Sequence, residues 1–331
     1  MNEVTIYSIA KMTGVSAATV SRVLNNNPHI SKATKLKVLK ALEENGYVPN
    51  DLARNLSSKS SMMIGILVSD IRENKQSNTL HTLCQEFDQQ GYSCLIYNTG
   101  FDPINFAGFA KQLSQKKVDG AILMGTVFKC PEMEKAVKKY LSNIPVIIIS
   151  GTMSGDNVYS IDCDINEGIG NCIKHLANKG RKCIGYVYAS SASPNPKTLN
   201  ELFETQIMKT GPFEHFMLPT ERRPEEISDT ISEIMNTHPN VDGLIFSDDY
   251  LAIGAIRAFY NIGKKVPSEV SIIGISNSRY TRMTIPLLTS LDTMLFDCAL
   301  IAVRSMIHLI HGEYVSKSVT LKTQLIERES T

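Results

Sequence analysis

The segment TIYSIAKMTGVSAATVSRVLN, residues 5–25, decides the fold of the N-terminal part of the chain. Thr5 and Ser16 are residue types that cap the N-termini of helices, and Gly14 between them suits the left-handed residue that ends a helix. The spacing therefore predicts a helix after Thr5, a tight turn, and a second helix that begins at Ala17.

The second predicted helix has two distinct faces. Val20 and Val23 belong to an apolar stripe that packs against the other helices. The opposite face carries small and polar side chains together with one arginine: Ala17, Ala18, Ser21, Arg22 and Asn25. Short side chains allow close approach, and a guanidinium can donate two hydrogen bonds to guanine O6 and N7 in the major groove. Ala17, Ala18 and Arg22 are therefore the candidate base-reading residues.

A third helix is predicted after the cap residue Ser31. We expect it to pack through Leu36, Leu39 and Leu42 and to end near Asn45.

The charge of the chain is unevenly distributed. Residues 1–60 hold eight basic and four acidic side chains, whereas the whole chain has a net charge of only +1. A local positive excess attracts phosphates, so this segment is predicted to bind DNA. Hydroxyl, amide and imidazole groups near its helix ends are candidates for backbone contacts: Thr5, Tyr7, Ser16, Thr19, Ser21, Asn25, His29, Ser31 and Asn50.

From Met62 onward, short apolar runs alternate with helical stretches. The predicted strands are 64–68, 94–97, 121–124, 146–149, 184–188, 243–246 and 271–275. This alternation favours an α/β fold with parallel sheets, repeated twice, with helices on both faces of each sheet. Ligands of such folds bind beyond the carboxyl ends of the strands.

Length and composition exclude several classes of protein. A chain of 331 residues points to two or three domains, and 43% hydrophobic with 20% charged residues fits a globular protein. No apolar run approaches the roughly 18 residues that a membrane-spanning helix needs, and Asn2 and Glu3 interrupt the N-terminus before any hydrophobic stretch. We therefore expect a cytoplasmic, nucleoid-associated protein without a membrane partner.

The remaining motifs indicate no catalysis. Seven cysteines without a CxxC pair favour reduced thiols over disulfides or a zinc site. Dinucleotide-binding, Walker, GxSxG and HExxH motifs are missing from the sequence, so we expect no enzyme activity, metal or cofactor.

The N-terminal residues also carry a family resemblance. The runs Thr5–Ala10, Gly14–Asn25, Gly46–Asn50 and Ala53–Leu56 resemble the headpiece of the lac-repressor/gal-repressor (LacI/GalR) family. The resemblance implies a helix-turn-helix DNA-binding domain over residues 1–60, with a hinge helix at about 51–57. It also implies that Ala53 and Leu56 enter the minor groove at the centre of a palindromic operator.

The body resembles the effector domain of the same family through stretches such as Val118-Asp119-Gly120 and Val270–Gly274. This implies an effector-binding and dimerisation domain over 62–331, similar to periplasmic sugar-binding proteins. By analogy, one subdomain takes about 62–160 and 292–320, and the other takes about 161–291 and 321–331. A homodimer and an interdomain cleft are expected.

Candidate residues of the effector cleft are Ser69, Asp70, Ser150, Tyr188, Asp248, Asp249, Ser276 and Leu295. The sequence departs from the family pattern here, because Leu199 stands where an effector-binding arginine is usual and Ser276 replaces an acid. The resemblance thus transfers the cleft and leaves the effector open between a sugar, a sugar phosphate and another small molecule.

The leading hypothesis is a sequence-specific transcriptional regulator, most simply a repressor, that binds operator DNA as a homodimer under the control of this effector. One alternative is a catabolite-control-type regulator that uses a phosphocarrier protein as corepressor, since Phe296, Asp297 and Arg304 resemble that branch. A further alternative is a solute-binding protein or an enzyme with an incidental helical head.

Overall fold

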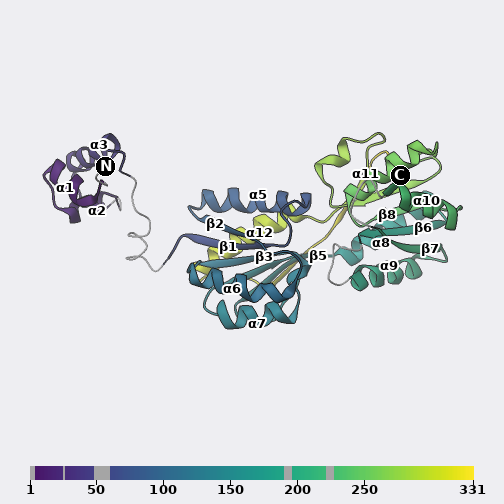
Figure 1. The fold of residues 1–331 in the computed structure, drawn as a ribbon, viewed down its shortest axis with the longest axis horizontal. Helices are drawn as coiled ribbons and strands as arrows, with labels where there is room; N and C mark the ends of the chain where they lie inside the picture. The colour runs from purple at the N-terminus through teal and green to yellow at the C-terminus, as the bar shows by residue number, and fades with distance from the viewer. Residues whose placement is uncertain (1–3, 25–26, 48–59, 190–195, 221–226) are drawn as a thin grey trace. The chain divides into compact units, whose positions relative to one another are not determined.

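The computed structural model describes residues 4–24, 27–47, 60–189, 196–220 and 227–331, with backbone alone for 196–200. The chain divides into two compact units, Met1–Ser61 and Met62–Thr331, which we call the N-terminal unit and the body (Figure 1). All seven cysteines are free thiols. Within the described residues, no helix is both long enough and apolar enough to cross a membrane.

The N-terminal unit contains the three predicted helices, α1 (Ile6–Thr13), α2 (Ala17–Leu24) and α3 (Lys32–Glu44). Each begins where a hydroxyl side chain accepts a first-turn backbone N–H. Thr5 Oγ1 accepts from Ser8 at 3.3 Å, Ser16 Oγ from Thr19 at 3.2 Å, and Ser31 Oγ from Thr34 at 3.2 Å. These bonds satisfy N–H groups that have no partner within the helix, which is why the helices start there.

The buried face of α3 differs from the prediction. Val38 is 0% exposed and Leu42 is buried, whereas Leu36 is 74% exposed and Leu39 is 45% exposed. The prediction that Leu36 and Leu39 pack against the other helices was therefore wrong. Positions 38 and 42 are four residues apart and share one face of the helix, and that face contacts Ile9, Val20 and Val23 of the other two helices.

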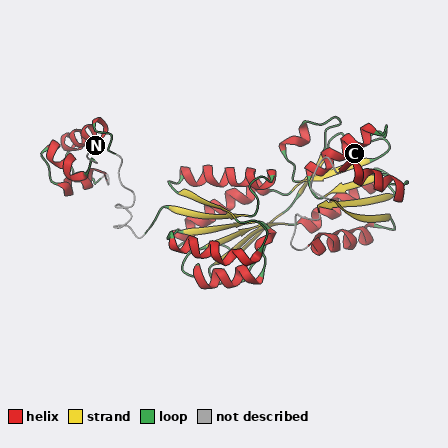
Figure 2. Cartoon of the chain, in the orientation of Figure 1, coloured by secondary structure: helices red, strands yellow, loops and turns green. Residues whose placement is uncertain are grey.

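The body is built from two six-stranded sheets (Figure 2). The first sheet has the order β11-β5-β4-β3-β1-β2, and every neighbouring pair is parallel. Its strands are β1 (Met63–Val68), β2 (Ser93–Asn98), β3 (Gly120–Met124), β4 (Val146–Ile149), β5 (Val158–Cys163) and β11 (Ser318–Leu321). Its helices are α5 (Asn74–Gln89), α6 (Phe106–Gln115), α7 (Pro131–Tyr140) and α12 (Leu295–Ile310), with α5 and α12 on one face and α6 and α7 on the other (Figure 1).

The second sheet repeats this architecture in the order β12-β10-β9-β8-β6-β7. Its strands are β6 (Cys183–Ala189), β7 (Glu214–Thr220), β8 (Gly243–Phe246), β9 (Ser271–Ile275), β10 (Thr289–Asp292) and β12 (Gln324–Ile326). Its helices are α8 (Ile165–Asn178), α9 (Pro196–Thr210), α10 (Ile227–Thr237) and α11 (Asp249–Asn261). Short 3₁₀ turns occur at Pro103–Asn105, Thr126–Phe128 and Arg279–Arg282.

The predicted α/β class with parallel sheets in two subdomains is confirmed, with one exception and several additions. The edge strand β12 is antiparallel to β10. Strands β5, β7, β10, β11 and β12 were not predicted, because their sequences mix polar and apolar residues and lack a continuous apolar run.

Three segments connect the two sheets, and two of them are hydrogen-bonded to each other. The Asp164 N–H donates to the carbonyl of Leu321 at 2.8 Å, and Thr323 Oγ1 donates to the carbonyl of Asp164 at 3.2 Å. The third segment lies between the end of β10 and the start of α12. The predicted subdomain boundaries at about 160 and 320 fall inside β5 and β11. The first two connecting segments therefore lie a few residues further along the chain than predicted.

Candidate DNA interface and effector site

Helix α2 presents the predicted base-reading residues because its other face is fixed in the core. Gly14 ends α1 in the left-handed conformation, at a φ of 63° that favours glycine, and its N–H donates to the carbonyl of Ala10. Val20 and Val23 are buried on the inner side of α2. Arg22 is exposed on the opposite side. Its guanidinium has no hydrogen bond or ion pair to any other described residue.

The two alanines of the candidate reading face differ in exposure. Ala18 is exposed, whereas Ala17 is half-buried and contacts the core of the unit. Neither side chain extends beyond Cβ, so the first turn of α2 allows close approach of a DNA groove.

The predicted backbone-contacting residues differ in whether they cap a helix and in how exposed they are. Thr5, Ser16 and Ser31 cap helices, and the Ser16 and Thr19 hydroxyls lie 2.9 Å apart. Tyr7 is 73% exposed. Ser21 is half-buried and His29 is exposed. Asn25, Asn50, Ala53 and Leu56, with the predicted hinge helix, lie outside the described residues.

In the first sheet, three predicted effector residues follow the carboxyl ends of strands. Ser69 comes directly after β1 and is buried; its hydroxyl accepts from Gln76 Nε2 at 2.7 Å. Asp70 accepts from the guanidinium of Arg72 at 2.7 and 2.9 Å. Ser150 follows β4 with a φ of 60°, in the left-handed region. Gln76 and Arg72 were missed by sequence reasoning because no motif distinguishes them from other helix-start residues.

In the second sheet, Asp248 and Asp249 lie at the start of α11. Asp248 is the cap, and its carboxylate accepts from the N–H of Leu251 at 3.0 Å. Asp249 is 3% exposed. It accepts from the Ser290 hydroxyl at 2.5 Å and from the N–H of Ser278 at 2.6 Å. Burial raises the pKa of Asp249 to about 6, and the two hydrogen bonds oppose that shift.

A polar network surrounds Asp249 at this edge of the sheet. Ser276 and Asn277 follow β9 with positive φ angles of 113° and 44°. The Asn277 amide donates to Asp292 at 2.8 Å and accepts from Arg328 at 2.6 Å. Arg328 lies near the end of the chain and was not predicted, because its distance in sequence from Asn277 hides the contact.

The last two predicted effector residues are mainly packed against apolar neighbours. Tyr188 is half-buried near the carboxyl end of β6 and stacks on Tyr186, with ring centroids 6.1 Å apart. Leu295 is the first residue of α12 and packs against the core of the first sheet.

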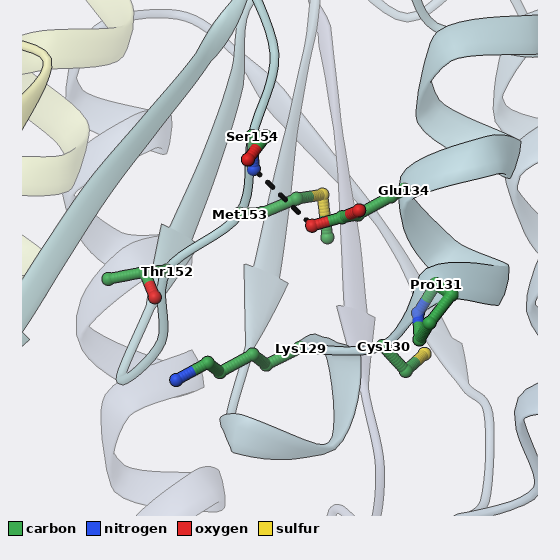
Figure 3. A pocket seen from close by; sticks show the side chains of 7 residues that line it. All are labelled: Lys129, Cys130, Pro131, Glu134, Thr152, Met153 and Ser154. Carbon is green, nitrogen blue, oxygen red and sulfur yellow. Dashed lines mark hydrogen bonds between the residues drawn. The ribbon is translucent and has the colours of Figure 1, made fainter.

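A cavity of about 450 Å³ lies elsewhere on the first sheet, after β3 and β4. Its lining residues are Lys129, Cys130, Pro131, Glu134, Thr152, Met153 and Ser154 (Figure 3). The dashed line in Figure 3 joins the Ser154 N–H to Glu134 Oε1, 3.5 Å apart, on one side of the cavity. None of the predicted effector residues lines it.

Comparisons with known proteins agree with this architecture. Residues 5–50 match the model of bacterial regulatory proteins of the lacI family, and residues 173–331 match a periplasmic binding protein-like domain. A solved structure of the lac repressor dimer bound to operator and the anti-inducer ONPF shares the fold, with a TM-score of 0.88 over 99% of both chains at 22% identity.

Two relatives extend the likeness over the whole sequence. An HTH-type transcriptional regulator from Lachnoclostridium phytofermentans is 30% identical, across 98% of this chain and 99% of the relative. The catabolite control protein A of Priestia megaterium is 27% identical, across 99% of both chains. The helix-turn-helix unit, the paired sheets and these similarities together show that the chain belongs to the lacI family of bacterial transcriptional regulators.

Proposed function

We propose that this transcriptional regulator reads its operator with the outer face of α2. Arg22 donates two hydrogen bonds to a guanine, while Ala17 and Ala18 allow the helix to approach the bases and contact thymine methyl groups. The observation that carries the proposal is the exposure of Arg22 on a helix whose first turn has only alanine side chains at 17 and 18 and whose opposite face is packed in the core.

The surrounding polar groups position the helix on the duplex. The proposed phosphate contacts come from Thr5, Tyr7, Ser16, Thr19, Ser21, Asn25, His29, Ser31 and Asn50. Ala53 and Leu56 of the hinge segment are proposed to enter the minor groove at the operator centre, where an apolar wedge separates base steps.

Two copies of the chain bind a palindromic site together. A homodimer matches the two-fold symmetry of such a site and places one α2 in each half-site. Exposed apolar side chains on the body support an interface between copies; Met283 is 70% exposed and Ile285 is 94% exposed.

A small-molecule effector, of the sugar or sugar-phosphate class, binds at the carboxyl ends of the strands and changes DNA affinity. Six of the eight candidate residues directly follow the carboxyl ends of β1, β4, β8 and β9. Ser150, Ser276 and Asn277 hold left-handed backbone conformations there, and such strain is concentrated at ligand sites. We place this regulation in the cytoplasm, on chromosomal DNA, and assign the chain no catalytic residue, metal or cofactor.

Selection from a pool of randomised duplexes tests the proposed function. The full-length chain should recover a palindrome and bind it with an affinity that falls steeply as salt rises. Recovery of random sequences, with no preference over bulk duplex, would contradict it.

A second candidate adds a protein corepressor. Phe296 is 61% exposed on α12, and Arg304 is exposed two turns further along that helix. An apolar and a basic side chain on one helix surface suit a phosphorylated phosphocarrier protein. Binding of the phosphorylated carrier, lost in Arg304→Ala, supports this candidate; equal binding of both forms of the carrier counts against it.

A further inference from the structure

The tripeptide Val-Asp-Gly occurs twice in the body, at 118–120 and at 241–243. Each copy leads into a buried strand, β3 in the first sheet and β8 in the second. The two copies also share a register: Gly120 pairs with Ile64 of β1, and Gly243 pairs with Ile184 of β6. The two aspartates therefore occupy equivalent positions in the two sheets.

In the second sheet, Asp242 binds the backbone at the start of β6. Its carboxylate accepts from the backbone N–H groups of Lys182 and Cys183, each at 2.9 Å. Its own N–H donates to the carbonyl of Cys183 at 3.2 Å. Arg181, which precedes Lys182, donates from Nε to the Ser271 hydroxyl at 2.9 Å. The residues that lead into β6 are therefore bound to their own sheet.

In the first sheet, Asp119 makes corresponding contacts to Met62 and Met63, at the start of the body. Its carboxylate accepts from the N–H of Met62 at 2.8 Å, and its N–H donates to the carbonyl of Met63 at 2.8 Å. The carbonyl of Met62 accepts from the N–H of Ser93 at 2.9 Å. Met62 is the first residue of the body, and the residue before it, Ser61, is the last of the N-terminal unit.

The backbone at Met62 is held in a conformation that it does not prefer. Its φ of 52° lies in the left-handed region, which is unfavourable for a non-glycine residue unless surrounding contacts fix it. The Met62 side chain packs against the core of the first sheet. A carboxylate acceptor makes a stronger hydrogen bond than a neutral one, so Asp119 is suited to hold this residue in place.

We propose that Asp119 is a positioning residue for DNA recognition. It fixes Met62, where the segment that joins α3 to the body, which we call the tether, ends. This inference rests on the proposed function. Without the carboxylate, the Met62 N–H loses this acceptor, whereas Met63 stays paired in β1. Met62 can then join the tether and lengthen it by up to about 3.5 Å. That length is close to the roughly 3.4 Å rise of one base pair, so a longer tether in each copy of a dimer tolerates a different spacing of half-sites.

The test measures spacing preference with the full-length chain. The probes are the palindromic duplex that the wild-type chain selects and two versions with one base pair added or removed at the centre. We expect the wild-type chain to prefer its own spacing by about tenfold, and Asp119→Ala to retain a preference of threefold or less. Asp119→Asn, which keeps an acceptor but loses the charge, should fall between them.

The matched control is Asp242→Ala, which removes the equivalent carboxylate from the second sheet. It should lower the melting temperature yet retain the wild-type spacing preference. A wild-type preference in Asp119→Ala, or in Asp119→Asn if the alanine variant does not fold, would overturn the proposal. An equal loss in Asp242→Ala would overturn it too.

Amide hydrogen exchange separates this proposal from the proposed function. Exchange at Met62 should be faster in Asp119→Asn than in the wild-type chain, whether or not a duplex is selected. Unchanged exchange at Met62 overturns the anchoring role itself, whereas failure of the wild-type chain to select any duplex contradicts the proposed function.

Discussion

The outer face of α2 and the strand ends of the body both carry polar side chains, yet they use them differently. On α2, the guanidinium of Arg22 has no partner among the described residues. At the strand ends, Asp70 is bound to Arg72, and Asp249 is bound to Ser290 and Ser278. A polar group that is already satisfied must break contacts before it binds a ligand.

On our proposal, this difference separates a surface whose polar side chains serve only to bind a ligand from one whose polar side chains also maintain the fold. On our proposal, replacing Arg22 removes an interaction with DNA and leaves the unit intact, because the guanidinium has no hydrogen bond or ion pair to another described residue. Replacing Asp249 changes the body itself, since the carboxylate connects the start of α11 to Ser278 in the loop after β9 and to Ser290 of β10.

The largest expected effect is on DNA binding by Arg22→Ala. A bidentate contact to guanine contributes about 1–3 kcal/mol of discrimination, and a dimer makes it twice. We expect preference for the selected duplex over random duplex to fall by about thirtyfold or more in competition gel shifts, with an unchanged melting temperature.

Lys11→Ala is the matched control for that loss. Lys11 is an exposed cation of the same unit on α1, so its removal should weaken binding to all duplexes similarly. An equal loss of sequence preference in both variants would show that charge alone, rather than base reading, explains the effect.

The next effect concerns the pH dependence of stability at Asp249. Its pKa is raised to about 6 by burial, from an ordinary value of 3.8. Between these values the folded state binds more protons than the unfolded state, so the free energy of unfolding falls as pH rises. The total decrease in the free energy of unfolding is on the order of 3 kcal/mol and is complete above about pH 6.

Asp249→Asn removes this titration and should flatten the stability curve between pH 4 and 6 in denaturant unfolding. Asp88→Asn, at an exposed position on α5, is the control and should leave the curve unchanged. An unaltered slope in Asp249→Asn would mean that Asp249 is ionised in the folded body as readily as in the unfolded chain.

A smaller effect distinguishes the two faces of α3. Val38→Ala deletes methyl groups from a fully buried side chain and should lower the stability of the N-terminal unit by about 2 kcal/mol. Leu36→Ala, at an exposed position, should change it by less than about 0.5 kcal/mol. Thermal unfolding of the two variants checks this order, and the reverse order would restore the face predicted from the sequence.

The smallest effect is expected from the cap of α1. Thr5→Ala removes the acceptor for the Ser8 N–H and should destabilise the N-terminal unit by about 1 kcal/mol. Thr5→Ser keeps the hydroxyl and should retain most of that stability. Equal loss in both variants, measured by thermal unfolding, would show that the cap contributes little.

The sequence was most informative where local rules decide the structure. The caps at Thr5, Ser16 and Ser31 and the turn at Gly14 predicted all three helices, because capping and left-handed turns depend on a few adjacent residues. The choice between Leu36 and Val38 failed because both are apolar, and only packing against the other two helices decides which face is buried.

The body shows the same limit at longer range. The strands that consist of continuous apolar runs were predicted, whereas β10 (Thr-Ser-Leu-Asp), β11 and β12 contain polar residues that resemble loops in the sequence. The contact of Arg328 with Asn277 joins residues 51 positions apart, and such contacts follow from topology rather than from a local motif.

The most direct test of base reading by Arg22 is methylation interference on the selected duplex. Methylation of guanine N7 removes the acceptor that the guanidinium is proposed to use. We predict that methylating one guanine in each half-site excludes the duplex from complexes with the wild-type chain and has no effect on complexes with Arg22→Ala. The same interference in both proteins, or none with the wild-type chain, would contradict the account.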